Sequence, residues 1–211
     1  MKENHLLVTK TARYFTLGEL NEHTKQVWFV LHGFGQMAAT FLKQFEPLVR
    51  KDIFFVAPEA LNHFYLKGSA GNVGATWMTK EDRLNEIKDY INYLNELYES
   101  LELEQFPETK ITALGFSQGA STITRWANAT PHRVDNVIVY AGEVGAEVFP
   151  LHQHSPLRRS NNYFIYGTRD EFFPHEVFLK MKTAYAEMNF TEIEFEGGHE
   201  IEPEILQGLM L

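Results

Sequence analysis

The chain of 211 residues contains no cysteine, and this absence removes several kinds of chemistry at once. Disulfide bonds, iron–sulfur clusters, cysteine-ligated zinc and a cysteine nucleophile are all excluded. A covalent staple is not required either, because a chain of this length buries roughly 70% of its unfolded surface when it folds. The chemistry of the protein must therefore come from other side chains.

Positive charge is also scarce. Nineteen Lys and Arg residues are outnumbered by 28 Asp and Glu residues, which gives a formal net charge of −9 with His neutral. Nucleic acids and anionic lipids both favour a basic protein surface. We therefore expect no nucleic-acid partner.

Long apolar runs are missing as well. The N-terminal sequence MKENHLLVTK lacks the apolar stretch of a secretory signal peptide, and no run approaches the ~20 residues that a membrane span needs. No repeat, low-complexity tract or linker-like shift in composition interrupts the chain. We therefore predict a single domain over residues 1–211, no membrane insertion and a cytoplasmic location.

Short apolar runs that end near glycine or proline alternate with helix-like segments. The runs predicted to be strands are residues 27–31, 53–57, 111–115, 137–141, 163–166 and 193–195. Most are apolar on both faces, which is typical of parallel strands covered by helices on both sides. Two further strands, over residues 6–8 and 13–17, are expected to form an antiparallel edge. The alternation predicts a three-layer α/β/α sandwich with a mostly parallel sheet of about seven or eight strands.

Helical periodicity is clearest between Thr79 and Leu103, where apolar residues recur at steps of three and four. The predicted buried stripe begins at Leu84, and Thr79 with Asp82 resembles a capping box. Further helices are predicted around residues 41–49, 120–129, 177–188 and 203–209.

The sharpest motif is a G-x-S-x-G sequence, Gly115-Phe-Ser-Gln-Gly119, between a predicted strand and a predicted helix. A serine in such a turn is held in a strained backbone conformation, and small residues two positions away on each side relieve the crowding. The N-terminus of the following helix offers N–H groups to a developing anion. We interpret Ser117 as a nucleophile, the alternative being a simple glycine-flanked turn.

A serine nucleophile needs a base, and the base needs an acid to orient it. In chain order the elbow serine is followed by Asp or Glu and then by His. Asp170 and His199 each follow a predicted strand, so both are expected at the same edge of the sheet as Ser117. Glu171 competes with Asp170 as the acid, and Asp170 could instead start a helix or pair with a neighbouring arginine. His199 could be a structural loop histidine.

Two N–H donors are needed to hold an oxyanion. We expect one from Gln118, the residue after the nucleophile. The second should come from the glycine-rich loop His32-Gly-Phe-Gly-Gln36, where glycines let the backbone approach a substrate closely. Phe34 is the preferred donor and Gly35, also expected against the substrate, is the fallback. A plain turn without this role is the alternative.

An ordered set of motifs carries a family resemblance. The segments Leu31-His-Gly-Phe-Gly-Gln36, Gly115-Phe-Ser-Gln-Gly119, Gly167-Thr-Arg-Asp170 and Gly197-Gly-His199 resemble the α/β-hydrolase superfamily. Within it, the chain looks like the phospholipase/carboxylesterase group, which includes acyl-protein thioesterases and small bacterial esterases. The resemblance spans about residues 27–200 and implies a Ser–Asp–His triad and no cofactor. The first 26 residues and the loop 59–79 are not part of it.

Three features concern the pocket and its ligands. Similar enzymes often carry Ser-Gly after the strand that follows the elbow, whereas this chain has Ala141-Gly-Glu143. Glu143 is therefore expected to face the pocket and to disfavour anionic substrates. Trp77, in the loop 60–79, is expected to form a pocket wall, with core packing as the alternative. No metal is expected at His152-Gln-His154, because no third ligand is near, and no nucleotide-binding fingerprint is present.

We therefore predict a serine carboxylic-ester hydrolase that acts on small or medium acyl esters, small molecules, through Ser117, His199 and Asp170. Two alternatives stay open. The same triad could cleave thioesters or lysophospholipids, or the chain could be a non-catalytic ligand-binding protein on a hydrolase scaffold. Homodimerisation is also left open.

Overall fold

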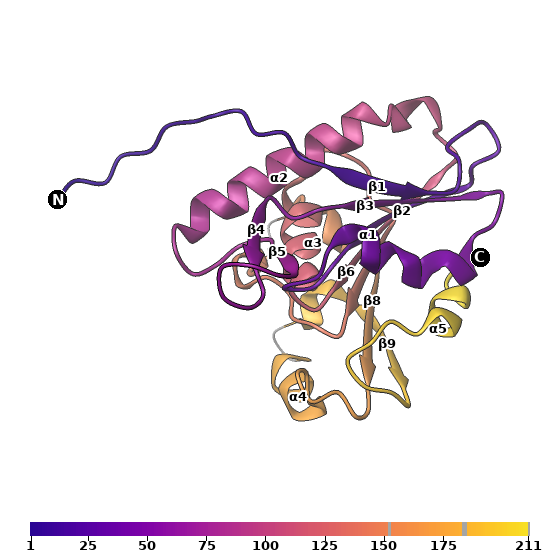
Figure 1. Ribbon diagram of the computed structural model, residues 1–211. Coiled ribbons are helices and arrows are strands. Elements are labelled where there is room, and N and C mark those ends of the chain that lie inside the picture. Colours follow the sequence, from indigo (N-terminus) through magenta and orange to yellow (C-terminus); the bar gives the residue numbers. More distant parts are fainter. Residues whose placement is uncertain (152, 183–184, 211) are drawn as a thin grey trace.

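The centre of the molecule is a seven-stranded sheet in the order β1-β3-β2-β6-β7-β8-β9 (Figure 1). It is seen in a computed structural model that describes residues 1–151, 153–182 and 185–210. The strands are β1 (Tyr14–Leu17), β2 (Gln26–Leu31), β3 (Ile53–Pro58), β6 (Lys110–Phe116), β7 (Asn136–Tyr140), β8 (Asn161–Gly167) and β9 (Phe190–Phe195). Strand β1 runs antiparallel to β3, and the other neighbouring pairs are parallel. The predicted parallel sheet with an antiparallel edge over residues 13–17 is confirmed.

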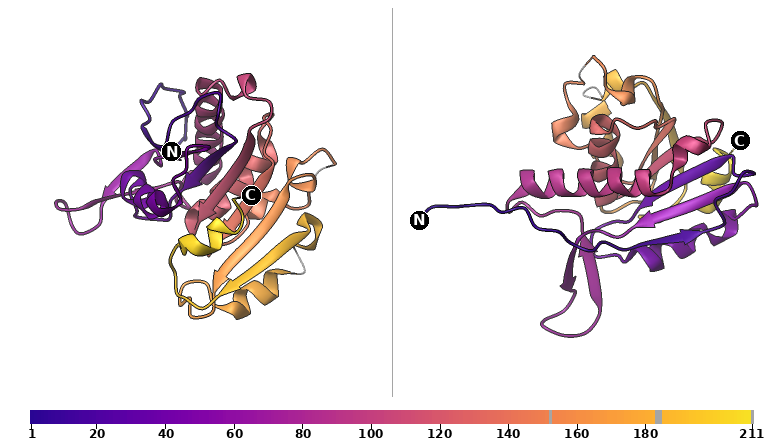
Figure 2. Two further views of the ribbon diagram at one scale, coloured as in Figure 1. Left: turned by 90° about the vertical axis from the view of Figure 1, so that its right-hand side faces the viewer. Right: turned by 90° about the horizontal axis from the view of Figure 1, so that it is seen from above.

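Helices cover both faces of this sheet (Figures 1 and 2). One layer contains α1 (Ala38–Leu42), the 3₁₀ helix η1 (Lys43–Leu48) and α5 (Pro203–Gln207); the other contains α2 (Arg83–Ser100), α3 (Gln118–Ala129) and α4 (His175–Lys182). Short 3₁₀ helices η2 (Leu103–Gln105), η3 (Ala146–Val148), η4 (Pro156–Arg158) and η5 (Ala186–Met188) complete the set. Within the described residues, no helix combines the length and the apolar character that a bilayer crossing requires.

The central strand β2 shows why the sheet needs two helical layers. All six of its residues are buried. Because side chains alternate along a strand, Val27, Phe29 and Leu31 pack into the core beneath α2 and α3. Trp28 and Val30 pack into the second core beneath α1, η1 and α5. Because residues 27–31 of this strand are all apolar, both of its faces require cover.

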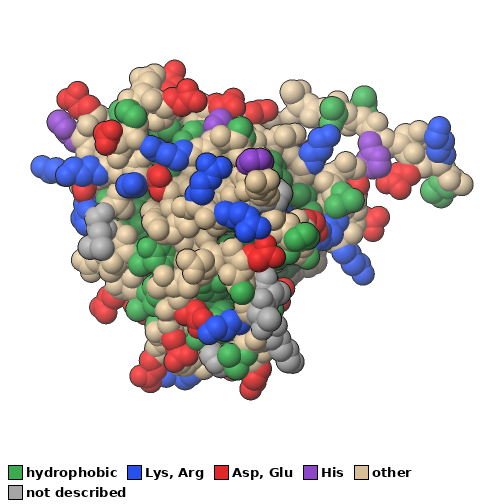
Figure 3. All heavy atoms as spheres, turned by 180° about the vertical axis from the view of Figure 1, so that it is seen from behind, with side chains coloured by type: hydrophobic (Ala, Val, Ile, Leu, Met, Phe, Trp, Pro, Cys, Tyr) green, Lys and Arg blue, Asp and Glu red, His purple; other side chains and the backbone are tan. Residues whose placement is uncertain are grey.

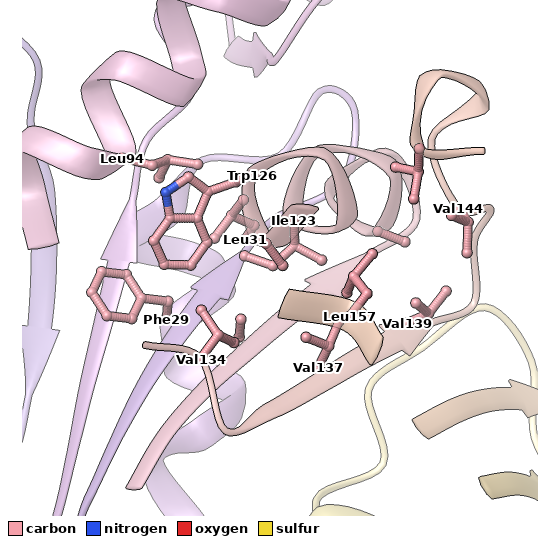
Figure 4. Close-up of a cluster of buried hydrophobic side chains, with 14 of the residues drawn as sticks. Phe29, Leu31, Leu94, Ile123, Trp126, Val134, Val137, Val139, Val144 and Leu157 are labelled. Carbon is pink, nitrogen blue, oxygen red and sulfur yellow. The ribbon is translucent and has the colours of Figure 1, made fainter. Parts of the chain in front are cut away.

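Trp126 of α3 lies at the centre of the larger core (Figure 4). Its ring centroid lies 5.3 Å from that of Phe29 and 6.4 Å from that of Tyr98. The indole N–H donates a hydrogen bond of 2.8 Å to the side-chain oxygen of Asn95 on α2. This residue therefore joins α2, α3 and the sheet, and its one polar atom is satisfied.

The segment predicted as the loop 60–79 contains a separate two-stranded hairpin. Strand β4 (Asn62–Tyr65) pairs antiparallel with β5 (Val73–Thr76). The hairpin projects away from the sheet and its helical layers (Figure 2). Its base lies against the loop after β2, because Gly35 N–H donates to the carbonyl of Ala75 at 2.8 Å.

The strand expected over residues 6–8 is not formed. Leu6, Leu7 and Val8 are 86%, 86% and 77% exposed, and this part of the chain extends away from the body of the molecule (Figure 3). Acidic and basic side chains both appear on the face that this view shows. The apolar run makes no strand because β-propensity reflects packing against neighbouring strands, and here no neighbour covers it.

The long helix differs from its prediction at the N-terminal end. Helix α2 begins at Arg83, and Leu84, expected in the buried stripe, is 73% exposed. Asp82 has a φ of 46°, and its side chain makes no capping hydrogen bond. The carboxylate of Glu86 instead accepts a hydrogen bond of 2.6 Å from the backbone N–H of Thr79. The predicted capping box is therefore wrong, because the side chain that binds the backbone of Thr79 is that of Glu86, one turn after Asp82.

Three other helices are also shorter than expected. The segment 41–49 is divided between α1 and η1, with Pro47 inside η1, and Val49 is 44% exposed. The segment 177–188 forms α4, which ends at Lys182, and η5, while residues 183–184 lie outside the described part of the chain. Helix α5 ends at Gln207.

Replacing Trp126→Ala should lower the free energy of unfolding by about 3–5 kcal/mol, since it opens a cavity where three elements meet. Leu84→Ala is the matched control, because its side chain is exposed and should change stability by less than ~0.5 kcal/mol. Urea denaturation monitored by circular dichroism measures both. Equal effects of the two substitutions would show that this core is not where the structure places it.

Candidate functional site

The backbone at Ser117 is strained. This residue lies between the end of β6 and the start of α3, with φ 54° and ψ −118°, in a region that non-glycine residues rarely adopt. A Cβ atom added to Gly115 would lie 2.1 Å from the carbonyl oxygen of Gly119, and one added to Gly119 would lie 2.3 Å from the carbonyl oxygen of Leu31. Glycine is therefore required on both sides of Ser117, as the motif predicts.

The neighbouring strand β7 supports this turn. Ser117 N–H donates to the carbonyl of Tyr140 at 2.9 Å. After β7 the chain passes so close that a Cβ on Gly142 would lie 2.4 Å from the carbonyl oxygen of Ser117. The end of β7 and the residues that follow it therefore pack directly against the strained turn.

Asp170 and His199 are in direct contact. Nδ1 of His199 lies 2.7 Å from Oδ2 of Asp170, whose side chain is fully buried. The other carboxylate oxygen accepts two backbone hydrogen bonds of 2.8 Å, from Phe172 and Phe173. Both oxygens of Asp170 are thus satisfied, which fixes the plane of the carboxylate and the orientation of the imidazole.

The neighbouring charged residues make different contacts. Glu171 is exposed, and its carboxylate is not the one that the structure places against His199. Arg169, the other partner considered for Asp170, pairs with Glu196 at 2.8 Å.

The imidazole of His199 lies between two aromatic rings. The centroid of its ring is 4.7 Å from that of Phe116 and 5.0 Å from that of Phe172. Phe116 directly precedes Ser117, so this packing brings the histidine to the elbow. Phe172 is 80% exposed and shields the outer side of the imidazole.

Ser117 and His199 line the same cavity, which has a volume of about 340 Å³. The other lining residues come from α2, α3, the segment after β7 and the loop after β8: Arg83, Gln118, Ser121, Arg125, Ala141, Gly142, Glu143, Val144, Ala146, Phe172 and Phe173. The expectation that Glu143 faces the pocket therefore agrees with this structure. The presence of two arginines was not predicted from the sequence.

Trp77 does not line this cavity. It is 1% exposed, and its indole N–H donates to the carbonyl of His32 at 2.8 Å. Its ring packs against those of His32 and Tyr90. The expectation of a pocket wall at Trp77 is therefore wrong, because its polar atom is used to anchor the loop after β2 to the core.

The loop after β2 lies against the nucleophile. A Cβ on Gly33 would be 3.1 Å from the Cβ of Ser117, and Gly33 N–H donates to the side chain of Gln36 at 2.8 Å. Gly35 N–H is already donated to Ala75, so the fallback donor is occupied. Among the described residues, the N–H groups of Phe34 and Gln118 have no hydrogen-bond partner. The two N–H groups expected to hold an oxyanion are therefore both free to donate.

The side chain of Gln118 has a role that sequence reasoning missed. Its amide oxygen accepts a hydrogen bond from the backbone N–H of Trp77 at 3.1 Å. Its amide nitrogen donates to the carbonyl of Met78 at 2.8 Å and to the hydroxyl of Thr76 at 3.0 Å. The residue after the nucleophile therefore fastens the start of α3 to the segment after the hairpin.

His32 is buried and neutral. Ala60 N–H donates to its Nε2 at 3.1 Å, so Nδ1 must carry the proton, which it donates to the carbonyl of Gly33 at 2.8 Å. Burial lowers the pKa of His32 below its usual value of 6.5. A neutral imidazole is thus part of the support of the loop after β2.

Two arginines and one glutamate form a cluster beside the cavity. Glu147 of η3 pairs with Arg83 through one oxygen and with Nε of Arg125, at 2.6 Å, through the other. Burial would raise the pKa of Glu147, but hydrogen bonds from the two arginines outweigh it and lower the pKa to about 2. Glu147 is therefore an anion throughout the ordinary pH range.

Two other features of the molecule lie away from this site. A larger cavity, about 720 Å³, lies beside Lys110 and Asn161 at the opposite ends of the strands, roughly 20 Å from Ser117 by the rise of a strand. Glu3, His5 and Asp82 form the one group of three close metal-ligand types among the described residues, and all three are exposed. His152 lies outside the described residues, so the structure does not address the His152–His154 pair.

The sequence matches a known family, and the fold is similar to those of known proteins. A family model described as alpha/beta hydrolase fold matches residues 29–159. No curated protein matches the sequence. Acyl-protein thioesterase 2 from Zea mays has a similar structure, with TM-score 0.68 and 17% identity over 94% of this chain and 96% of that chain.

Two bacterial structures are similar to the same degree. A phospholipase/carboxylesterase from Dyadobacter fermentans gives TM-score 0.66 and 16% identity, with 96% of each chain covered. A carboxylesterase from Mesorhizobium loti gives TM-score 0.67 and 17% identity, with 94% of each chain covered. At these identities the likeness shows a shared fold, and the chemistry must be argued from the site.

Stability should depend on pH through His32. Because its folded-state pKa lies below 6.5, its contribution is complete above pH 6.5 and is lost as the pH falls through the folded-state pKa. We expect His32→Gln, which can still accept from Ala60 but does not titrate, to flatten the fall in the free energy of unfolding between pH 7.5 and 5.5.

Urea denaturation at the two pH values measures this difference. His23→Gln is the matched control, because His23 is exposed and its removal should leave the pH dependence as in the unmodified protein. If His32→Gln retained the full pH dependence, the neutral buried imidazole would be excluded.

Proposed function

The chain belongs to the alpha/beta hydrolase fold family, and we propose that it is a serine carboxylic-ester hydrolase acting on small or medium acyl esters. The observation that carries this proposal is the contact between Asp170 and His199 at the cavity that Ser117 also lines. A ligand-binding protein has no need of a buried carboxylate that orients a histidine beside a strained serine. The chemistry of such an arrangement is acyl transfer.

Acylation of the serine is the first half of the proposed reaction. Ser117 Oγ attacks the acyl carbon, and its proton passes to Nε2 of His199. Asp170 holds the opposite ring N–H and stabilises the imidazolium that forms. The N–H groups of Gln118 and Phe34 hold the tetrahedral oxyanion, each lowering the barrier by roughly 3 kcal/mol. The bond to the alcohol oxygen then breaks, and His199 returns the proton to that oxygen.

Deacylation repeats these steps with water. His199 takes a proton from the water as its oxygen attacks the acyl-enzyme carbonyl, and the same two N–H groups hold the second oxyanion. When the bond to Ser117 breaks, His199 returns the proton to the serine oxygen. The free acid leaves, and the enzyme is restored.

Thioester cleavage by the same groups is the second candidate. It is supported by the structural similarity to an acyl-protein thioesterase, and the proposed steps differ only in the leaving atom. Rates on an ester and a thioester with the same acyl chain separate the two, and the same comparison on a lysophospholipid tests that substrate. A cytoplasmic location stays a prediction, and homodimerisation stays open.

Ser117→Ala should reduce kcat for p-nitrophenyl butyrate by at least ~10³-fold, because it removes the attacking atom. The far-ultraviolet circular dichroism spectrum should not change. Ser100→Ala, at the end of α2, is the matched control and should retain the unmodified rate. Full turnover by Ser117→Ala would refute the assignment, because the reaction would then not use this serine.

The identity of the acid can be tested separately. Asp170→Asn should lower kcat by about 10²–10⁴-fold, because an amide cannot hold the histidine in the required tautomer with the same strength. Glu171→Gln, one residue further along, should stay within about twofold of the unmodified rate, since surface groups away from the site contribute little. The reverse order of effects would make Glu171 the acid.

A further inference from the structure

The cavity beside Ser117 has a cationic side that sequence reasoning did not foresee. Arg83 at the start of α2 and Arg125 in α3 both line it, and Glu147 bridges them from η3. Two cations and one permanent anion leave this cluster with one unit of positive charge. The chain as a whole carries −9, so this charge is a local feature of the cavity.

Helix α3 connects this charge to the nucleophile. Ser117, Ser121 and Arg125 are spaced four residues apart, so they follow one another along one face of the helix, and all three line the cavity. Side chains on a helix tilt toward its N-terminus. Accordingly, Nη1 of Arg125 lies 3.1 Å from Oγ of Ser121. The guanidinium is therefore about one helical turn, ~5.4 Å along the axis, from the level of Ser117.

Arg125 is held firmly but keeps donors unused. The residue is 5% exposed. Its Nε donates to Glu147, and its Nη1 contacts the hydroxyls of Tyr90 at 3.4 Å and Ser121. Among the described residues, Nη2 of Arg125 has no hydrogen-bond partner. A buried guanidinium with an unused nitrogen beside a cavity is ready to donate to a ligand.

The surrounding backbone is adapted to this arginine. A Cβ atom on Gly145 would lie 2.6 Å from Cγ and from Nε of Arg125. Gly145 N–H donates to Thr124 on the same helix at 3.0 Å. The segment before η3 therefore lies directly across the arginine stem, and this fixes the direction of its side chain.

Glu143 is the one acidic residue among those that line the cavity. Its side chain is exposed to solvent. An exposed carboxylate is screened by water far more than a buried guanidinium. The arginine side therefore governs what charge the cavity prefers.

We propose that the Arg83–Arg125 side of the cavity binds a carboxylate carried by the ester substrate, so that the preferred substrates are half-esters or other esters with a free carboxylate. Arg125 is the principal specificity-determining residue and Arg83 assists it from the more exposed end. The planar fork of a guanidinium suits a carboxylate. This inference rests on the proposed ester hydrolysis, and it replaces the expectation from Glu143 alone that anionic substrates are disfavoured.

Matched substrates test the charge without changing the shape. Mono-p-nitrophenyl glutarate carries a carboxylate on its acyl chain, and p-nitrophenyl 5-methylhexanoate has an isopropyl group in the same place. A second pair, 4-carboxyphenyl butyrate and 4-isopropylphenyl butyrate, carries the difference on the leaving group. The measured quantity is the anionic-to-neutral ratio of kcat/KM on the full-length protein, after subtraction of hydrolysis seen with Ser117→Ala.

Three variants then assign the preference to residues. Arg125→Gln should lower the ratio by about tenfold in the pair whose carboxylate reaches it, and Arg83→Gln by about two- to threefold because its side chain is more exposed. Glu143→Gln is the matched control and should not lower the ratio. The intrinsic reactivity of each ester does not depend on the variant. A change in the ratio between the unmodified protein and a variant therefore reports the altered side chain alone.

The outcomes are distinct. A purely structural Arg125 would change both members of a pair equally and leave the ratio unchanged, which would overturn the proposal. If Arg125→Gln does not fold, an unchanged ratio in Arg83→Gln overturns it, and a lowered ratio supports it. If the neutral esters are hydrolysed but neither ratio responds to any variant, the inference fails and ester hydrolysis stands. If the unmodified protein hydrolyses none of the four esters, both fail together.

Discussion

The positive φ angle at Ser117 is the constraint from which the geometry of the site follows. A residue with a φ of 54° persists only where its surroundings leave it no alternative. Here the surroundings are Gly115 and Gly119, each so close to a neighbouring carbonyl that no other residue fits. Because both glycines lack a side chain, the end of β2, the end of β6 and the start of α3 can come into contact. The strain does not stabilise the fold, but the strained turn places the hydroxyl of Ser117 at the edge of the sheet.

The parallel sheet supplies the remaining groups at that edge. The loop after β2, the turn after β6, and the segments after β8 and β9 all leave the carboxyl ends of their strands on the same side. Asp170 and His199 therefore meet although 29 residues separate them. Helices supply the two arginines that line the cavity beside these groups. Helix α3 carries Arg125, and α2 begins with Arg83. The fold thus fixes where the proposed acyl transfer would take place, and α2 and α3 carry the two arginines proposed to select the substrate.

Local patterns predicted the parts of the structure that local physics decides. Apolar runs on both faces predicted the parallel strands, and the spacing of Gly115, Ser117 and Gly119 predicted the elbow. Periodicity could not predict how far a helix extends past the core, so Leu84 was expected to be buried and is exposed. Nor could it predict the use of single polar atoms. Trp77 anchors a loop through its indole N–H, a contact between residues 45 positions apart.

The proposed reaction requires Ser117 to be an activated nucleophile. Labelling with a fluorophosphonate, followed by mass spectrometry of the digested protein, tests it most directly, because such a probe reacts with an activated serine and not with an ordinary one. We expect a single adduct on Ser117, formed much more slowly in His199→Ala. An unlabelled protein, an adduct on another serine, or labelling unaffected by His199→Ala would contradict it.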